Sequence, residues 1–157
     1  MTNGILCADR PRMAAVRHTA GHLNRVTSAI IAAAIEVHRL LGSGLLESAY
    51  RKCLVIELQR AGLRCEQKRA VPLIYKGVRG TPAYEADVVV EDCVIVEVKA
   101  VEALHPIYEQ QLLTYLRLAD CRVGPVLNFG GATLKRGIRR VVNNFPEDGG
   151  DQTQTDD

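Results

Sequence analysis

The chain has 157 residues, of which 47% are hydrophobic and 24% charged, and a formal net charge of +2. These values are ordinary for one soluble domain with its own core, and no apolar run is long enough to cross a membrane. Five of the 18 acidic residues lie in residues 146–157, so the other 145 residues carry a net charge of +7, which suits a polyanionic partner.

The cysteines are five in number, widely spaced and without a CxxC pair. This pattern predicts reduced thiols in a cytoplasmic protein and argues against a disulfide framework or a zinc site. Arg10 and Arg12 are followed by no apolar core, so we expect no secretory signal. The cysteines are Cys7, Cys53, Cys65, Cys93 and Cys121.

Residues 1–23 show no clean hydrophobic period and are predicted to form a flexible N-terminal extension. From Thr27, apolar side chains recur at helical spacing as far as Leu41, and Thr27 or Ser28 is expected to cap this first helix. His38 lies on or beside the apolar stripe, and we expect it to be packed there rather than to bind a ligand.

A second helix is predicted from about residue 45 to residue 61, after the glycine-rich break at residues 42–44. Glu47 precedes Tyr50 by three residues and leans toward the apolar face of this helix. It is either a carboxylate that requires a partner, or an acid that the helix dipole favours in the first turn, capped from Gly44. The predicted buried residues are Leu46, Ala49, Tyr50, Cys53, Leu54 and Leu58.

Two strand-like segments follow at residues 64–68 and 71–75, with a turn at Lys76–Gly77. Residues 87–99 then read as two valine-rich strands joined by a polar turn. The second of these strands is apolar on both faces up to Glu97, which is typical of a central strand covered on both sides.

The relative position of Asp87 and Glu97 depends on the loop of this hairpin. A two-residue loop would place them on opposite faces, whereas a three-residue loop from Glu91 to Cys93 would pair them on one face. A five-residue loop or a bulge would have the same effect. Paired carboxylates beside Lys99 would suit a divalent cation; in the alternative, Glu97 and Lys99 only pair with each other on a surface hairpin.

A third helix is predicted over residues 106–119, because Pro106 suits its first position. Gln111 and Tyr115 share a face with Ile107 and Leu118, so they are expected as polar tips on a largely buried stripe. The strand predicted next, at residues 123–129, should pair in parallel with the strand before the helix.

Residues 133–142 are predicted to form a final strand or a short helix with a basic, solvated face. The acidic, glycine-rich residues 146–157 are predicted to be a disordered tail. Residues 24–145 therefore make up the expected domain. The basic residues of the final segment are Lys135, Arg136, Arg139 and Arg140.

Four short motifs occur in a characteristic order, and together they carry a resemblance. They are Gly44-Leu45-Leu46-Glu47-Ser48-Ala49-Tyr50, Tyr84-Glu85-Ala86-Asp87, Glu97-Val98-Lys99 and Gln111-x-x-x-Tyr115. Over residues 24–142 the chain resembles the GxxExxY protein family, a branch of the PD-(D/E)XK nuclease superfamily. The resemblance implies an α/β fold: a restriction-endonuclease-like core in which helices flank a mixed central sheet.

The resemblance also implies a site. Asp87 and Glu97 would bind Mg²⁺ or Mn²⁺, and the carbonyl of Val98 would complete the inner sphere. Lys99 would position the attacking water and stabilise charge on the phosphoryl group. Glu47 would complete the acidic site from the first core helix.

Other residues of the motifs would support this site. Gln111 and Tyr115 match the helical motif of the family, and Tyr50 ends the GxxExxY string. Ala86 stands where the superfamily often has proline, a residue that binds no metal.

The function expected from this resemblance is metal-dependent hydrolysis of phosphodiester bonds in DNA or RNA. The alternative is a non-catalytic module of the same fold that binds nucleic acid or protein. The chain has seven aromatic Phe and Tyr residues, which leaves few platforms for stacking bases. We expect no separate recognition domain, so target choice would require a homodimer or a protein partner.

Overall fold

The computed structural model describes residues 18–148, apart from the side chains of residues 81–83. Most of the predicted extension and most of the predicted tail lie outside the described residues. Among the helices that are described, none is both long enough and apolar enough to cross a membrane.

Three α-helices, one 3-10 helix and five strands make up the described part of the chain. The helices are α1 (Ala20–Leu41), α2 (Glu47–Arg60), α3 (Pro106–Ala119) and the 3-10 helix η1 (Lys135–Gly137). The strands are β1 (Cys65–Tyr75), β2 (Val78–Val90), β3 (Val94–Lys99), β4 (Val123–Asn128) and β5 (Ile138–Val142).

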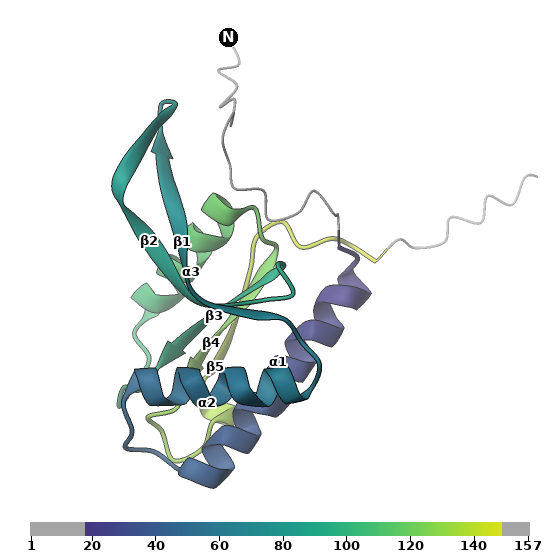
Figure 1. Ribbon diagram of the computed structural model, residues 1–157, viewed down its shortest axis with the longest axis vertical. Coiled ribbons are helices and arrows are strands. Elements are labelled where there is room, and N and C mark those ends of the chain that lie inside the picture. The colour runs from purple at the N-terminus through teal and green to yellow at the C-terminus, as the bar shows by residue number, and fades with distance from the viewer. Residues whose placement is uncertain (1–17, 149–157) are drawn as a thin grey trace, which may run out of the picture.

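The strands form one mixed sheet in the order β1-β2-β3-β4-β5. β3 and β4 are parallel, as the sequence predicts for strands joined through a helix, and the other neighbours are antiparallel. Helices α1 and α2 cover one face of the sheet, and α3 covers the other (Figure 1). The predicted α/β architecture, a mixed sheet flanked by helices, is confirmed.

The central strands are buried on both faces, which explains their unbroken apolar sequence. Val94 and Val96 of β3 pack into the core beneath α1 and α2. Ile95 points to the other face, where it packs with Leu112 and Leu116 of α3. Alternate residues of β3 therefore face opposite layers, and Glu97 and Lys99 continue the set that faces α3.

Helix α1 begins earlier than the sequence predicts. Its first residue is Ala20, and the hydroxyl of Thr19 caps it by accepting a hydrogen bond from the His22 amide (3.2 Å). The predicted start at Thr27 is wrong because the apolar stripe continues back to the buried Leu23.

Helix α2 begins at Glu47, and Leu46 is its N-cap residue. Leu46 is 77% exposed, so its predicted burial is wrong, because it precedes the helical turn that would direct it inward. Tyr50, Leu54 and Leu58 are buried as predicted. His38 is packed, also as predicted: it is 8% exposed, and its Nε2 lies 3.0 Å from the carbonyl oxygen of Gly131.

Strand β1 is continuous, whereas the sequence indicates two segments, and it turns into β2 at Lys76–Gly77 as predicted. β3 pairs with β2 only over Val88–Val90. The remainder of the β1–β2 hairpin, residues 69–75 and 78–86, extends beyond the sheet as a two-stranded arm (Figure 1).

Candidate functional site

The hairpin between β2 and β3 has a three-residue turn, Glu91–Cys93, because Val90 pairs with Val94. Both Glu91 and Asp92 have positive φ, which reverses the chain within this short loop. The sequence leaves several loops open, and this three-residue loop is one of those that set Asp87 opposite Glu97. The two carboxylates therefore lie on the face of the sheet that α3 covers.

The two carboxylates accept hydrogen bonds from backbone amides just beyond the point where the pairing of β2 with β3 ends. Asp87 Oδ2 accepts from the Val98 amide (2.9 Å), and Glu97 Oε1 accepts from the Asp87 amide (3.4 Å). Glu97 is 5% exposed. Each side chain is thus fixed by the backbone of the strand that carries the other.

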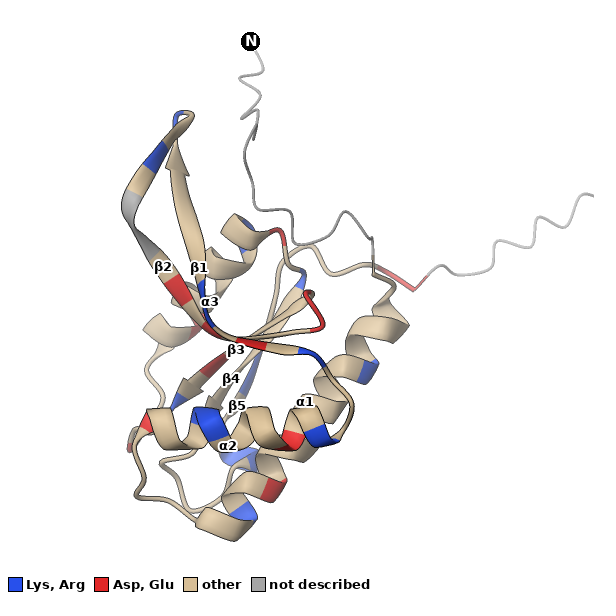
Figure 2. Ribbon diagram, in the orientation of Figure 1, with Lys and Arg blue, Asp and Glu red and all other residues tan. Residues whose placement is uncertain are grey.

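The pKa of Glu97 is raised from an ordinary 4.5 to about 8. Burial is the main cause, the charge of Asp87 is the second, and Lys99 opposes the shift. At neutral pH the buried carboxyl thus retains a proton that a cation can replace. Two hard oxygen donors on adjacent strands fit a divalent cation such as Mg²⁺ or Mn²⁺. Figure 2 shows acidic segments on β2 and β3 where the strands meet.

Lys99 ends β3 on the same face, two residues beyond Glu97. Its ammonium lies 4.8 Å from the centre of the Tyr108 ring, which is close enough for a cation–π contact. Tyr108 is in the first turn of α3 and precedes Tyr115 by two helical turns. That spacing is the signal from which Tyr108 could have been recognised in the sequence.

Lys68 of β1 is a site residue that the sequence analysis missed. Its Nζ lies 3.6 Å from Asp87 Oδ1 and 3.8 Å from Glu85 Oε2. Its φ of 53° is left-handed, which is unusual for a lysine within a strand. The residues on either side keep their pairing with β2, so this turn of the backbone places Lys68 opposite Asp87. Nothing local in the sequence indicates it.

Helix α3 brings Tyr115 to the carboxylates but leaves Gln111 exposed. The pKa of Tyr115 is raised by burial first and then by the charges of Glu97 and Asp87. Its ring also contacts that of Tyr84 at 5.5 Å between centres. The predicted placement of Gln111 on a buried stripe is wrong, because the buried line of α3 runs through Leu112 and Leu116.

Tyr50 anchors the start of α2. Its ring is buried and stacks on Phe129 at 4.6 Å between centres, and its hydroxyl donates to the Gly42 carbonyl (2.5 Å). The Phe129 amide in turn donates to the Lys99 carbonyl (2.8 Å). One aromatic stack therefore connects the helix that carries Glu47 with the end of β3. Glu47 itself is exposed, at the first position of α2.

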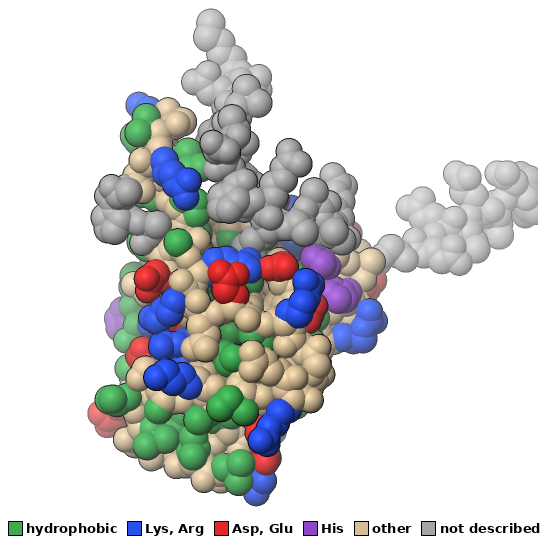
Figure 3. Space-filling view, viewed as in Figure 1, with side chains coloured by type: hydrophobic (Ala, Val, Ile, Leu, Met, Phe, Trp, Pro, Cys, Tyr) green, Lys and Arg blue, Asp and Glu red, His purple; other side chains and the backbone are tan. Residues whose placement is uncertain are grey.

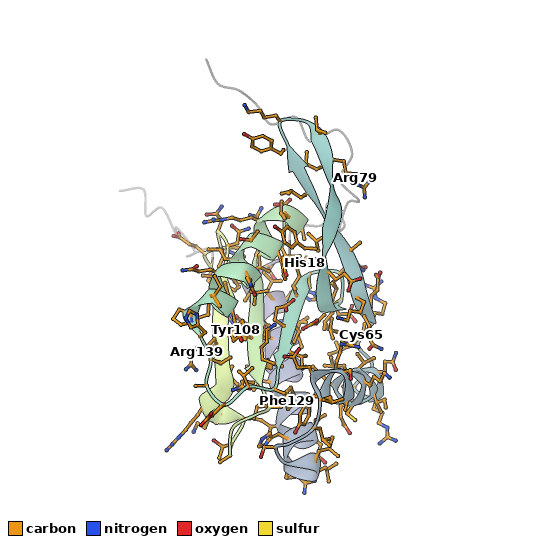
Figure 4. The ribbon with its side chains drawn as sticks, turned by 90° about the vertical axis from the view of Figure 1, so that its left-hand side faces the viewer. His18, Cys65, Arg79, Tyr108, Phe129 and Arg139 are labelled. Atoms are coloured by element: carbon orange, nitrogen blue, oxygen red, sulfur yellow. The ribbon has the colours of Figure 1, made fainter. Side chains whose placement is uncertain are left out.

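A hollow of about 600 Å³ lies beyond the end of β4. Asn128, which pairs with Lys99 across the sheet, is part of its lining, and so are the exposed Arg136 and Arg139. Figure 4 shows Arg139 and Tyr108 on the same side of the molecule, with Phe129 below them. Asn128 also holds the loop after β3, since its side chain bonds both the amide (3.0 Å) and the carbonyl (2.9 Å) of Val101.

Comparison with known proteins supplies one match. No curated protein and no solved structure is similar enough to count as a match. A family model described as the PD-(D/E)XK nuclease superfamily does match, over residues 24–141. The matched region runs from within α1 to within β5, and the mixed sheet between two helical layers is the restriction-endonuclease-like arrangement. By this match, the chain belongs to the PD-(D/E)XK nuclease superfamily.

Proposed function

We propose that this protein is a metal-dependent nuclease that hydrolyses phosphodiester bonds, and that it belongs to the GxxExxY branch. The observation that carries the proposal is the buried Glu97, held beside Asp87 within the reach of Lys99. Burying the Glu97 carboxylate beside that of Asp87 costs free energy. Binding of a cation would compensate for this cost, which is a reason for the protein to keep such a pair. Nucleases of the superfamily generally use divalent metal ions.

Asp87 and Glu97 would hold the cation, Mg²⁺ or Mn²⁺, together with the Val98 carbonyl. Glu47 would add a carboxylate from α2. The chemistry that the cation supplies is Lewis-acid stabilisation of the charge that builds up on the phosphate oxygens. The chain's own contribution is to fix both carboxylates through backbone amides, so that little reorganisation is needed.

Lys99 would orient the attacking water and stabilise the charge of the phosphoryl group. Its ammonium is held over the Tyr108 ring, which limits the conformations of a flexible side chain. Tyr115 lies close to both carboxylates and would support their orientation, and Gln111, which is exposed, would reach the substrate rather than the carboxylates.

Nucleic acid is the substrate that the charge distribution supports. Arg136 and Arg139 line the hollow beyond Lys99, and both are exposed. Arginine side chains contact phosphate groups without regard to base sequence. A strand that follows this hollow would pass the end of β3, where the carboxylates lie.

The decisive experiment is single-turnover cleavage of a panel of DNA and RNA, duplex and single-stranded, with Mg²⁺ or Mn²⁺. Lys99→Ala should lower cleavage by on the order of a hundredfold or more, as for loss of one preorganised electrostatic group. It should leave Mn²⁺ affinity intact or slightly higher, because a nearby positive charge is gone. Lys99→Arg should not restore full activity, since a planar guanidinium cannot replace a compact ammonium.

Lys52→Ala, which removes an exposed lysine from α2, is the matched control and should keep wild-type activity. Unchanged cleavage in a folded Lys99→Ala variant would contradict the mechanism. Binding of nucleic acid by a wild-type protein that cleaves none of the panel would favour the non-catalytic module.

A further inference from the structure

A second group of metal-binding side chains lies at the other end of the β2–β3 hairpin. His18, His22 and Cys93 each offer one ligand atom, and these atoms all lie within 4.8 Å of one another. Cys93 Sγ is 4.0 Å from His22 Nε2, although 71 residues separate them in the sequence. The two imidazole rings are stacked, with centres 4.8 Å apart. In Figure 3, histidine side chains lie together beside acidic and basic side chains.

We propose that His18, His22 and Cys93 bind one transition-metal ion, with Zn²⁺ the expected occupant, and thereby tie the start of α1 to the β2–β3 turn. Two imidazoles and a thiolate form a borderline-soft donor set, which favours Zn²⁺ over Mg²⁺. Bonds of about 2.0 Å to nitrogen and 2.3 Å to sulfur, arranged tetrahedrally, would separate the ligand atoms by roughly 3.3 to 3.6 Å. Side-chain rotations that move the ligand atoms by about an ångström would bring them to bonding distance from one ion.

The surroundings of the three residues agree with this chemistry. The pKa of His18 is lowered, by burial first and by His22 second, which favours the neutral imidazole that a metal ligand requires. The pKa of the Cys93 thiol is raised to about 11, chiefly by burial, so metal binding would release its proton.

The neighbouring carboxylates are already paired. Asp92 Oδ1 accepts from Arg69 (2.6 Å), and Glu91 Oε1 accepts from the Arg64 amide (2.7 Å). Within residues 18–148, these three side chains are therefore the ligands that we propose, and water would fill the fourth position.

This site is separate from the proposed catalytic one. Cys93 is the last residue of the turn before β3 and precedes Glu97 by four residues, which corresponds to about 13 Å of extended chain. A metal ion at the hairpin turn would therefore not touch the phosphate at Lys99. Its expected effect is on stability, because it would join two segments that are far apart in the sequence.

Titration with Co²⁺ provides a direct test on the full chain, whose cysteine thiols are kept reduced with a phosphine. Co²⁺ should bind at one equivalent and give a thiolate-to-cobalt charge-transfer absorption, which Zn²⁺ should abolish by displacement. Zn²⁺ should also raise the melting temperature. Cys93→Ser should lose the absorption, and His22→Gln should weaken Co²⁺ binding by at least about tenfold, the scale for loss of a group close to a bound metal.

Cys53→Ser is the matched control, because Cys53 lies on α2 outside the cluster, and it should keep the absorption. Asp87→Asn should keep it too, since the carboxylate site contains no sulfur; the test thus remains valid if the proposed nuclease function fails. His22→Gln, at a half-buried position, serves if Cys93→Ser does not fold. The proposal would be overturned if the wild-type protein showed no such absorption. It would also be overturned if Cys7→Ser lost the absorption while Cys93→Ser kept it.

Discussion

Glu97 is deeply buried and lies beside a second carboxylate. Both features raise the pKa of its carboxyl group well above the ordinary value. Between about 4.5 and 8, the folded protein keeps this proton while the unfolded chain has lost it. The folded state therefore loses stability as pH rises through this range, and it is most favoured at the acidic end. The proposed cation would remove this loss of stability by replacing the proton.

We expect the metal-free protein to become less stable as pH rises from about 5 to 8, relative to a Glu97→Gln variant. The glutamine has a similar shape but no titration, so the difference between the two free energies of unfolding isolates Glu97. Urea denaturation at several pH values with a chelator present measures it. Parallel pH profiles for the two proteins would show that Glu97 titrates normally.

Lys68 would oppose the proposed cation binding, because its ammonium lies beside Asp87 Oδ1. Lys68→Met should therefore bind Mn²⁺ several-fold more tightly, since a like charge near the cation is removed. Mn²⁺ titration followed by electron paramagnetic resonance measures the affinity. Lys76→Met, at the tip of the arm, is the control. Weaker binding in Lys68→Met would instead mean that Lys68 organises Asp87 for the metal.

At the scale of elements, the start of α2 is positioned by the stack of Tyr50 on Phe129 rather than by a side-chain cap. The same stack reaches the end of β3 through the Phe129 amide. Contacts through Phe129 thus connect the start of α2, where the exposed Glu47 lies, with the end of β3.

If Glu47 contributes to the cation site, Glu47→Ala should reduce the rise in melting temperature that Mn²⁺ produces. The physical reason is that a missing carboxylate lowers the affinity of the folded protein for the cation. Glu57→Ala on the same helix is the control. An equal rise in wild type and Glu47→Ala would place Glu47 outside the site.

At the scale of the whole molecule, the β1–β2 arm projects beyond the sheet next to the site (Figure 1). Its tip carries the exposed side chains Tyr75, Lys76 and Arg79, and Arg79 points away from the arm in Figure 4. Positive charge at a distance from the carboxylates can hold a long polyanion without taking part in hydrolysis.

A Lys76→Ala/Arg79→Ala double variant should bind nucleic acid more weakly. The slope of the logarithm of its binding constant against the logarithm of salt concentration should be smaller in magnitude by roughly one to two. Its cleavage rate at saturating protein should stay close to that of wild type. Fluorescence anisotropy at several salt concentrations measures the slope. Lys52→Ala/Arg60→Ala on α2, which removes the same charge elsewhere, should bind like wild type. Equal binding by the two double variants would exclude the arm as a contact.

Much of the fold follows from local patterns. Pro106 and the apolar spacing after it define α3, and the valine-rich runs define the central strands, because these signals reflect backbone preference and burial within a few residues. Asp87, Glu97 and Lys99 stand out for the same reason, as charges at the ends of apolar strands. The roles of Gln111 and Tyr115 remain predictions, as do the homodimer or protein partner and the cytoplasmic location.

The tertiary structure decided the features that depend on distant parts of the chain. The three-residue turn, which sets the two carboxylates on one face, depends on left-handed backbone at Glu91 and Asp92, and sequence spacing alone allows several loops. Lys68 reaches Asp87 only because the backbone turns at one residue of β1. His22 meets Cys93 only because α1 packs beside the hairpin. Local sequence determines which elements form, whereas packing and loop geometry determine which side chains meet, since contacts between distant residues leave no periodic signal.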